Sequence, residues 1–510
     1  MSTIYAFFLS LPYAAAIEPH LPVLQVVFPL LCAPICVLLR DAKLSWAWVT
    51  IVTWISFFIA MVLLGKVLTS GLIVYEIGNW PPPWGIEYRI DAANALVLVI
   101  ITAIGALTMP YAKQSVAKEV SEPRIYLFYL MYLLCLTGLI GITTTADAFN
   151  LFVFLEISSL SSYVLISLGR NRRALTASYR YLVMGTLGAT FYIIGVGLMY
   201  MMTGSLNMAD LATLLPAVDH TRTVLAAFAF IVIGLGLKLA MFPLHTWLPN
   251  AYAFAPSTVT VFLASTATKV AIYALLRLVF TVFGGTGLFD TTDFNIIMIL
   301  LAMAGMFAGA FVAIFQTDIK RMLAYSSVSQ VGYMILGIGI ATASGVTGGI
   351  VHMFNHAIMK GGAFMAMGAV FYVLGSVKLN DMAGLSKRMP ITSAVFLVAG
   401  LSLIGTPATV GFISKWQLVE AALDMGWWYV AVGLLATSLL AIVYVWRVVE
   451  VMYLTPPPEG AALRTEAPVS MLVPMIVMAA AAVWFGFDGD STLRVASEAA
   501  NALMAPIGGK

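Results

Sequence analysis

Residues 234–249 read GLGLKLAMFPLHTWLP, which places an ammonium and a helix-breaking proline inside an apolar stretch. A lysine at mid-bilayer depth costs about 2.5–3.5 kcal/mol on insertion scales, so Lys238 requires a partner or a function there. Pro243 removes a backbone donor, which a membrane tolerates only beside protein or a wet cavity. Because ion-coupled transporters place charges beside interrupted helices, the stretch indicates an ionisable site within a membrane.

The composition is typical of a helical membrane protein. The 510 residues are 61% hydrophobic and 10% charged, with a mean hydropathy of +0.98, which excludes a soluble domain of this length. With a minimum of about 18 apolar residues for each crossing, the chain predicts about 14 spans. These spans lie near 22–40, 44–66, 92–111, 124–144, 147–168, 177–203, 223–243, 257–283, 294–316, 322–341, 345–376, 392–422, 427–454 and 469–487.

The order of the spans predicts an internal repeat. Spans 4–8 and 9–13 are two sets of five, and each set has one helix interrupted by a proline, Pro243 or Pro407. We therefore expect an all-α polytopic fold with two inverted five-helix repeats. Turn formers and aromatic residues predict a surface hairpin at 75–91. The expected segments are 1–123 (N-terminal helices and hairpin), 124–283 (first repeat), 294–454 (second repeat) and 455–510 (C-terminal helix and tail).

Basic residues separate onto two sets of alternating loops. The larger set contains Arg40, Lys43, Lys113, Lys118, Arg124, Arg170, Arg172, Arg173, Arg180, Lys320, Arg321, Lys378, Lys387, Arg388 and Arg464. The other set, or its membrane edge, contains Lys66, Arg89, Arg222, Arg277, Arg494 and Lys510. The positive-inside rule predicts that the larger set is cytoplasmic and that both termini face outward. The lysines left inside predicted spans are Lys238, Lys269, Lys360 and Lys415.

Span 5 contains Glu156, a carboxylate far from any predicted membrane boundary. Glu156 has two compatible interpretations: a structural counter-ion for a buried lysine, and a partner that changes that lysine's affinity for protons. The cost of placing a carboxylate there favours the functional interpretation. Asp147, at the edge of the span, is expected to be a helix cap.

Span 8 places hydroxyl groups one helical turn before Lys269 and Tyr273 one turn after it. Polar contacts between helices would explain the hydroxyls but not the ammonium, so a proton relay is favoured. In span 11, His352, His356 and Lys360 follow at i, i+4 and i+8 on one helix face, about 12 Å from end to end. A histidine pair at i, i+4 also suits zinc, but no HExxH glutamate or third ligand accompanies it. Since histidine changes charge near neutral pH, a file of proton carriers is the better interpretation.

Span 12 carries Lys415 directly after a segment of glycines and Pro407 that loosens the backbone. Glu420 and Asp424 lie toward the outer end of this span; an exit for protons and ordinary solvated charges explain them equally well. The predicted proton relay comprises Glu156, Lys238, Lys269, His352, His356, Lys360 and Lys415. Four unpaired buried ammoniums would together cost about 10 kcal/mol or more, which leaves few structural explanations for this line of groups.

At these residues the chain resembles the antiporter-like family shared by Mrp-type multisubunit cation/proton antiporters, complex I and membrane-bound hydrogenases. The resemblance covers most of the chain and rests on ADAFNLFVFLEISSLSSYVLISLG, GLGLKLAMFPLHTWLPNAYAFAPS, TATKVAIYALLR, DIKRMLAYSSVSQVGY and GFISKWQLVEAALDMG. Within the family, ADAFNLFVFLEISSLSSY and YMMTGSLNMADLA are most similar to D subunits of Mrp antiporters. Lys415 departs from the complex I subunits that carry glutamate at this place.

The resemblance implies a Glu156–Lys238 pair, a relay to Lys415, and work inside a larger membrane assembly. The implied function is proton translocation in a monovalent cation (Na+)/proton antiporter of the bacterial inner membrane, with other subunits and lipid as partners. The alternatives are a proton-pumping subunit of a complex I-like or hydrogenase-type respiratory complex, and a proton-coupled partner for uptake of a solute such as inorganic carbon. The sequence does not predict a direct sodium site, because no span interior carries the clustered carboxylates that would bind the ion. Since no nucleotide loop, catalytic triad or haem or iron–sulfur spacing is present, we expect a secondary transporter subunit without cofactors, and no nucleic-acid partner.

Overall fold

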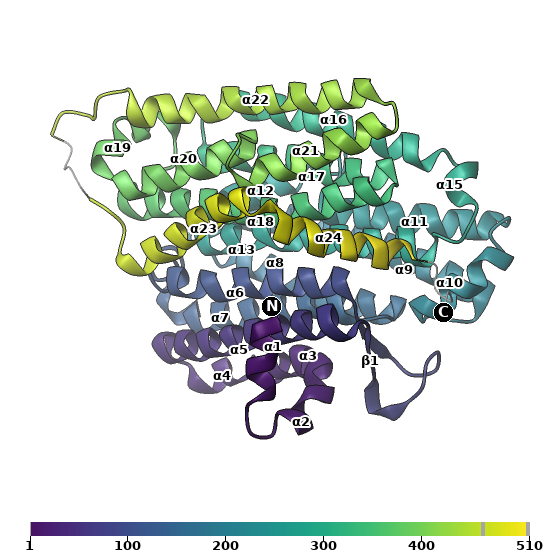
Figure 1. Ribbon diagram of the computed structural model, residues 1–510. Coiled ribbons are helices and arrows are strands. Elements are labelled where there is room, and N and C mark those ends of the chain that lie inside the picture. Colours follow the sequence, from purple (N-terminus) through teal and green to yellow (C-terminus); the bar gives the residue numbers. More distant parts are fainter. Residues whose placement is uncertain (1, 461–464, 506–510) are drawn as a thin grey trace.

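The computed structural model describes residues 2–460 and 465–505. Within these ranges, thirteen helical segments are long and apolar enough to cross a membrane. The fourteenth expected crossing, 392–422, is present as two shorter helices separated by a break. Most of the long helices run side by side along one direction, with residues 455–460 at one end and a hairpin at the other (Figure 1). The all-helical polytopic architecture predicted from hydropathy is confirmed.

The N-terminal segment contains the helices α1 to α6 and a two-stranded sheet. Its helices are α1 (Ser2–Leu9), α2 (Ala14–Ile17), α3 (Leu21–Cys32), α4 (Ile35–Leu39), α5 (Ala42–Ser70) and α6 (Ala92–Glu119). Strand β1 (Ile73–Glu76) pairs with β2 (Glu87–Ile90) in antiparallel register, so the predicted hairpin is confirmed. Asp91 follows β2 directly and caps α6 through the backbone N–H groups of Ala93 and Asn94.

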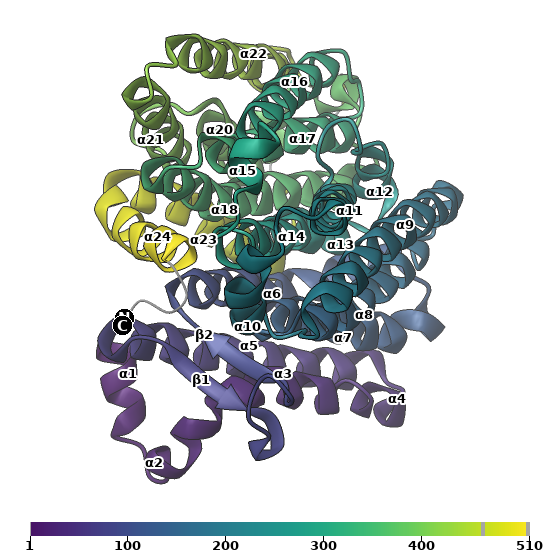
Figure 2. The same cartoon turned by 90° about the vertical axis from the view of Figure 1, so that its right-hand side faces the viewer.

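Two sets of helices follow in the same order. The first consists of α7 (Ile125–Thr144), α8 (Ala148–Ser167), α9 (Arg172–Thr203), α10 (Met208–Leu214), α11 (Arg222–Leu239), α12 (Leu248–Phe254), α13 (Ser257–Ser265), α14 (Ala267–Leu276) and its π-helical continuation η5 (Arg277–Val282). The second consists of α15 (Leu288–Thr291), α16 (Phe294–Ile314), α17 (Ile319–Ile340), α18 (Ala343–Leu374), α19 (Leu385–Arg388), α20 (Pro390–Ile404), α21 (Val410–Asp424) and α22 (Trp428–Tyr453). The view along the helices shows the sets as successive layers above the N-terminal segment (Figure 2).

The packing within the two sets corresponds. Helix α7 packs on α8 and α8 on α9, as α16 packs on α17 and α17 on α18. Helix α9 then contacts the interrupted helix α11, as α18 contacts the two halves of the interrupted helix, α20 and α21. Helices α9 and α11 can approach closely because Gly234 has no side chain. A Cβ at Gly234 would lie only 2.7 Å from the carbonyl oxygen of Gly188. The glycines around Lys238 therefore let two backbones approach at the ionisable site.

Within the two helix sets, helix breaks occur at both predicted prolines and at one further place. Helix α11 ends at Ala240, whose φ of 62° is left-handed, before Pro243, and α20 ends at Gly405 before Pro407. The third break separates α13 from α14 at Thr266, which has φ −125° and ψ −58°. This break has no proline or glycine at its centre, and the sequence did not predict it.

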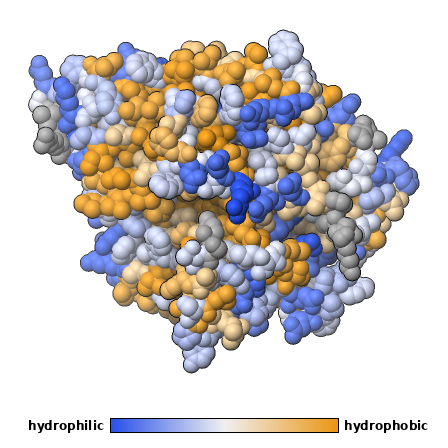
Figure 3. All heavy atoms as spheres, viewed as in Figure 1, coloured by the Kyte–Doolittle hydropathy of each residue, from blue (hydrophilic) through white to orange (hydrophobic). Residues whose placement is uncertain are grey.

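The chain returns along the outside of the bundle in α23 (Val469–Phe487) and α24 (Gly489–Met504). Helix α24 packs on α6 and α18 through small residues such as Ala496 and Ala499, which are fully buried. Its opposite face carries exposed Asp490, Arg494 and Glu498. Figure 3 shows hydrophilic side chains of α24 on a side of the molecule whose surface is otherwise hydrophobic over large areas.

Candidate functional site

The first pair of the site lies between α8 and the last turn of α11. The ammonium of Lys238 is 3.6 Å from the carboxylate of Glu156 and donates a hydrogen bond of 2.6 Å to the hydroxyl of Ser159. The side chain of Lys238 is 4% exposed, whereas that of Glu156 is 26% exposed. The lysine therefore lies inside the bundle, and the side chain of Glu156 is partly exposed at its surface.

Asp147 occupies the position expected of a helix cap. Its carboxylate accepts a 2.6 Å hydrogen bond from the backbone N–H of Asn150, in the first turn of α8. Burial raises the pKa of Asp147 above its ordinary value, and the backbone hydrogen bond opposes this change. Asp147 thus fixes the start of the helix that carries Glu156.

Lys269 lies just beyond the break between α13 and α14. Its ammonium contacts the carbonyl oxygen of Ala264 and lies 3.4 Å from the hydroxyl of Thr268. The break frees that carbonyl from the helical pattern, so the buried ammonium replaces a backbone donor. A cavity of about 20 Å³ borders Lys238, Ser159 and the first turn of α14 at Ala267. Since one water needs about 10–15 Å³, this cavity has room for a water between Lys238 and the start of the helix that carries Lys269.

The predicted file on α18 is present and fully buried. The rings of His352 and His356 are 6.1 Å apart with an interplanar angle of 9°. One turn further, the ammonium of Lys360 donates to the carbonyl of Leu323 at 2.7 Å and contacts the hydroxyl of Ser326. Helix α18 packs on α17 and on α13, which directly precedes the helix of Lys269, and α14 packs on α17. The file therefore lies in the centre of the bundle, on helices that adjoin the helix of Lys269.

Lys415 lies on α21 but neutralises the end of α20. Its ammonium donates to the carbonyls of Leu403 and Ile404, each at 2.9 Å, and to the hydroxyl of Ser438 at 3.1 Å. The last carbonyls of a helix are unpaired and carry partial negative charge, which suits a cation. Neither Lys415, Lys360 nor Lys269 has a carboxylate partner among the residues that the structure describes. Their charge can therefore change without leaving an unpaired carboxylate.

Tyr333 connects the α18 file with Lys415, a role that the sequence did not predict. Its ring stacks on His352 at 5.1 Å and lies 4.8 Å from the ammonium of Lys415. Ser414, next to Lys415, is 2.9 Å from Nδ1 of His352. The signal was the polar face of α17, where Ser326 precedes Tyr333 by seven residues.

Several buried polar atoms along this line have no protein partner in the described ranges of the chain. They are His352 Nε2, both ring nitrogens of His356, Ser265 Oγ, Gln330 Oε1 and Asn355 Oδ1. Buried polar groups are almost always paired with protein or with ordered water. Ordered water is the usual partner of such atoms where the protein supplies none.

Gly405 can be used to test the support of Lys415. Its φ is +90°, and a Cβ there would lie 2.8 Å from Cδ of Lys415. We expect Gly405→Ala to lower stability by about 1–2 kcal/mol, from the strain of a left-handed residue, and to move the ammonium off the α20 carbonyls. Thermal unfolding measures the loss of stability, and proton transport in vesicles measures the effect of moving the Lys415 ammonium. Gly197→Ala is the control, because a Cβ there meets open space; a Gly405→Ala protein as stable and active as Gly197→Ala would contradict this role.

The two predicted exit residues lie apart from the buried line. Glu420 and Asp424 are both exposed, and Glu420 accepts a 2.6 Å hydrogen bond from the indole of Trp416. Both are on the half of α21 that leads away from Lys415 toward the end of the bundle opposite the α19–α20 connection. Their exposure agrees with either interpretation offered by the sequence.

Two buried ion pairs involve residues that the sequence assigned to loops or to a membrane edge. Lys320 is 3% exposed and lies 4.0 Å from Glu119. Arg277 is 7% exposed and lies 2.7 Å from Asp91. Both partners are distant in sequence, so only the fold brings the charges together.

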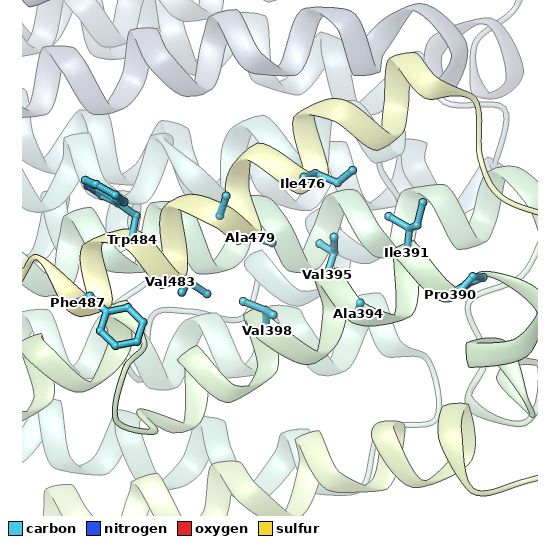
Figure 4. Close-up of a pocket in the computed structure, with 11 residues that line it drawn as sticks. Pro390, Ile391, Ala394, Val395, Val398, Ile476, Ala479, Val483, Trp484 and Phe487 are labelled. Atoms are coloured by element: carbon cyan, nitrogen blue, oxygen red, sulfur yellow. The ribbon is translucent and has the colours of Figure 1, made fainter.

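A broad groove between α20 and α23 lies outside the site. It has a volume of about 930 Å³ and is lined by aliphatic and aromatic side chains such as Val395, Val398 and Trp484 (Figure 4). No lining side chain can carry a proton, since the one N–H group there belongs to the indole of Trp484. The groove is therefore a surface for apolar contacts and does not belong to the polar line.

The fold and the buried cations define a polytopic membrane protein with ionisable groups aligned through its interior. Residues 145–441 match the family described as NADH:quinone oxidoreductase/Mrp antiporter, TM. The chain belongs to this family, which confirms the resemblance seen in its motifs.

Relatives with two different names align over nearly the whole chain. The N subunit of the NADH-quinone oxidoreductase of Desulforudis audaxviator is 42% identical over 93% of this chain and 97% of its own length. The D subunit of the Na(+)/H(+) antiporter of Alkalihalophilus pseudofirmus is 31% identical over 86% of this chain and 88% of its own. A chain in the structure of the Mrp complex from Dietzia sp. DQ12-45-1b superposes with a TM-score of 0.88, at 26% identity, covering 96% of this chain and 98% of that one.

Proposed function

We propose that this chain is the proton-translocating subunit of a multisubunit monovalent cation (Na+)/proton antiporter. The observation that carries the proposal is the buried line from the Glu156–Lys238 pair to Lys415, with polar atoms along it whose usual partner is ordered water. Buried cations in membrane helices are expensive and mark ion or proton pathways. The similarity to antiporter D subunits supports sodium as the exchanged cation.

In this mechanism, Glu156 holds the proton on Lys238 by opposing its charge. When that pairing weakens, the proton passes through Ser159 and the adjoining cavity toward Lys269. It continues through water and Lys360 to His356 and His352, and through Ser414 to Lys415. Glu420 and Asp424 are the proposed exit to the outer side. Each step changes only the local balance of charges, and no covalent bond to the protein is formed.

The two helix sets are the proposed inverted repeats, 124–283 and 294–454. They lie between an N-terminal segment, residues 1–123, and a C-terminal segment, residues 455–510. The matching contacts of α7 to α9 and α16 to α18 support this division. The charge bias of the loops supports an orientation with both termini outside, in the inner membrane of a bacterium. In that orientation α21 leads from Lys415 toward the outer side.

Partner subunits are proposed for two surfaces that lipid does not suit. The first is the lateral face where Glu156 is partly exposed and the interrupted backbone reaches the surface at Pro243. Irregular backbone and carboxylates are not exposed to lipid tails, so another subunit covers this face. The second is the polar face of α24, with Asp490, Arg494 and Glu498. The need to cover these two surfaces agrees with a protein that functions as one subunit of a larger membrane assembly.

The test is cation-dependent proton exchange by the assembled complex. Inverted vesicles are prepared from cells that lack other sodium/proton antiporters and express the complete complex. Addition of Na+ is expected to dissipate an imposed pH gradient, and the purified complex is expected to contain only antiporter-type subunits. A complex with iron–sulfur subunits, and with proton movement that requires electron transfer, would contradict the antiporter. The 42% identity to a quinone oxidoreductase subunit is the observation behind that second candidate, a proton-pumping respiratory subunit.

A further inference from the structure

A second polar cavity lies at the end of the bundle that carries most of the basic loops. Its volume is about 370 Å³, and it is bounded by the end of α6, the α8–α9 connection, the α12–α13 junction, the start of α17 and the segment after α18. The backbone bridges between Val120 and Gly169, and between Asp318 and Lys378, hold its walls. The cavity thus touches both helix sets, and it is separate from the line of groups between Glu156 and Lys415.

Five cations and two carboxylates line this cavity: Lys118, Arg170, Arg173, Lys320 and Lys378, with Glu119 and Asp318. The carboxylates are already engaged. Glu119 lies 4.0 Å from buried Lys320 and accepts hydrogen bonds from the Ser115 hydroxyl at 2.8 Å and from the Ser257 backbone N–H at 3.0 Å. Asp318 caps α17 by accepting from the backbone N–H of Arg321 at 2.9 Å.

The other four cations have no carboxylate partner within residues 2–460 and 465–505. Lys118 contacts the carbonyl of Tyr372 and lies 4.9 Å from the ring centre of the same residue, and Arg170 donates to the carbonyl of Val120 at 3.2 Å. The guanidinium of Arg173 lies 5.7 Å from the ring centre of Phe254. Like charges that converge on one cavity repel each other, so an anion bound between them would be stabilised by all four.

The positive-inside bias alone does not explain this arrangement. Exposed cations such as Lys43 and Arg124 belong to the same set of loops but do not line the cavity. Guanidinium groups bind phosphate through paired N–H donors, and basic pockets between spanning helices bind anionic headgroups. The aromatic walls at Phe254 and Phe371 suit the less polar portion of such a molecule.

We propose that this cavity binds a phosphate-bearing anion, which ties the α8–α9 and α12–α13 connections of the first helix set to the ends of α17 and α18 in the second. The anion is supplied by the headgroup of an acidic lipid or by free phosphate. The site does not depend on the proton relay, and the loss of one would leave the other in place.

The test uses the full chain, purified in detergent and freed of lipid. Thermal unfolding is followed during titration with phosphatidylglycerol, with phosphatidylethanolamine and with inorganic phosphate. We expect phosphatidylglycerol to raise the unfolding temperature and phosphatidylethanolamine to have little effect. Since each surface cation contributes about fivefold to the binding of acidic lipid, Arg170→Gln with Lys378→Gln should weaken binding about 30-fold. Both side chains are exposed, so the double variant is expected to fold.

Lys43→Gln with Arg124→Gln is the matched control, because it removes two exposed cations of the same loops away from the cavity. This control should bind as the unchanged chain does. Protection by inorganic phosphate alone, lost in the Arg170/Lys378 variant, would identify free phosphate as the source and support the site. Equal protection by both lipids, or equal binding by both double variants, would overturn the proposal. Native mass spectrometry of bound lipid gives the same comparison independently of thermal stability.

Discussion

Replacement of Lys238 by alanine, or of Glu156 by glutamine, is expected to reduce sodium-dependent proton exchange to the level of vesicles without the protein. Lys238 is the only relay lysine with a carboxylate partner among the described residues, at 3.6 Å. Without the ammonium there is no proton to release. Without the charge on Glu156, the proton of Lys238 is no longer held by an opposing charge. Dissipation of a pH gradient on addition of Na+ measures the exchange.

Lys66→Ala provides the matched control for this experiment. Lys66 also pairs with a glutamate, Glu18, at 3.0 Å, but both side chains are partly exposed and lie outside the relay. An exposed pair contributes only about 0–1 kcal/mol, so the variant should be normally abundant and fully active. A Lys238→Ala protein with normal abundance and unchanged exchange would contradict the relay at its first step.

Lys360→Met is expected to stop proton exchange without loss of thermal stability. The ammonium of Lys360 is fully buried, and its removal relieves a desolvation cost of about 2.5–3.5 kcal/mol. Its partners remain satisfied, because the hydroxyl of Ser326 already donates to the carbonyl of Leu323 at 3.0 Å. The unbranched thioether of methionine fills the space of the lysine stem. Unfolding temperature and vesicle exchange, measured on the same preparation, separate stability from transport.

Lys320→Met is the comparison variant for Lys360→Met, and the quantity compared is the change in unfolding temperature. Lys320 is on the same helix as Ser326 and is also buried, but its partner is the carboxylate of Glu119. Removing one member of a buried ion pair leaves the other charge uncompensated, so Lys320→Met should lower the unfolding temperature. Equal losses of stability in the two variants, or normal exchange by Lys360→Met, would show that Lys360 is a structural cation.

The sequence could predict the features that depend on local composition. Long apolar segments predicted the spans, and the run of aromatic and turn residues before Asp91 predicted the hairpin. The prolines at 243 and 407 predicted two helix breaks, because proline acts on its own backbone. Spacing of four residues predicted the adjacent rings of His352 and His356.

Features that depend on distant partners were not predictable from one sequence. The break at Thr266 was not predicted either, although its contact is local: the Lys269 ammonium meets the carbonyl of Ala264, and no proline or glycine marks the place. Lys320 follows Asp318 in a charged run and was therefore assigned to a loop. In the structure it is buried, where it pairs with Glu119, about 200 residues earlier in the chain. The exposure of Glu156 likewise depends on which helices cover α8.

The most direct test of the continuous relay is a cryo-EM map of the assembled complex at a resolution that shows ordered water. The relay predicts water density that joins Lys238 to Lys269 through the cavity beside Ser159, and His356 to Lys360, with no gap longer than two waters before Lys415. Dry apolar packing between Lys238 and Lys269, or between His352 and Lys415, would contradict it.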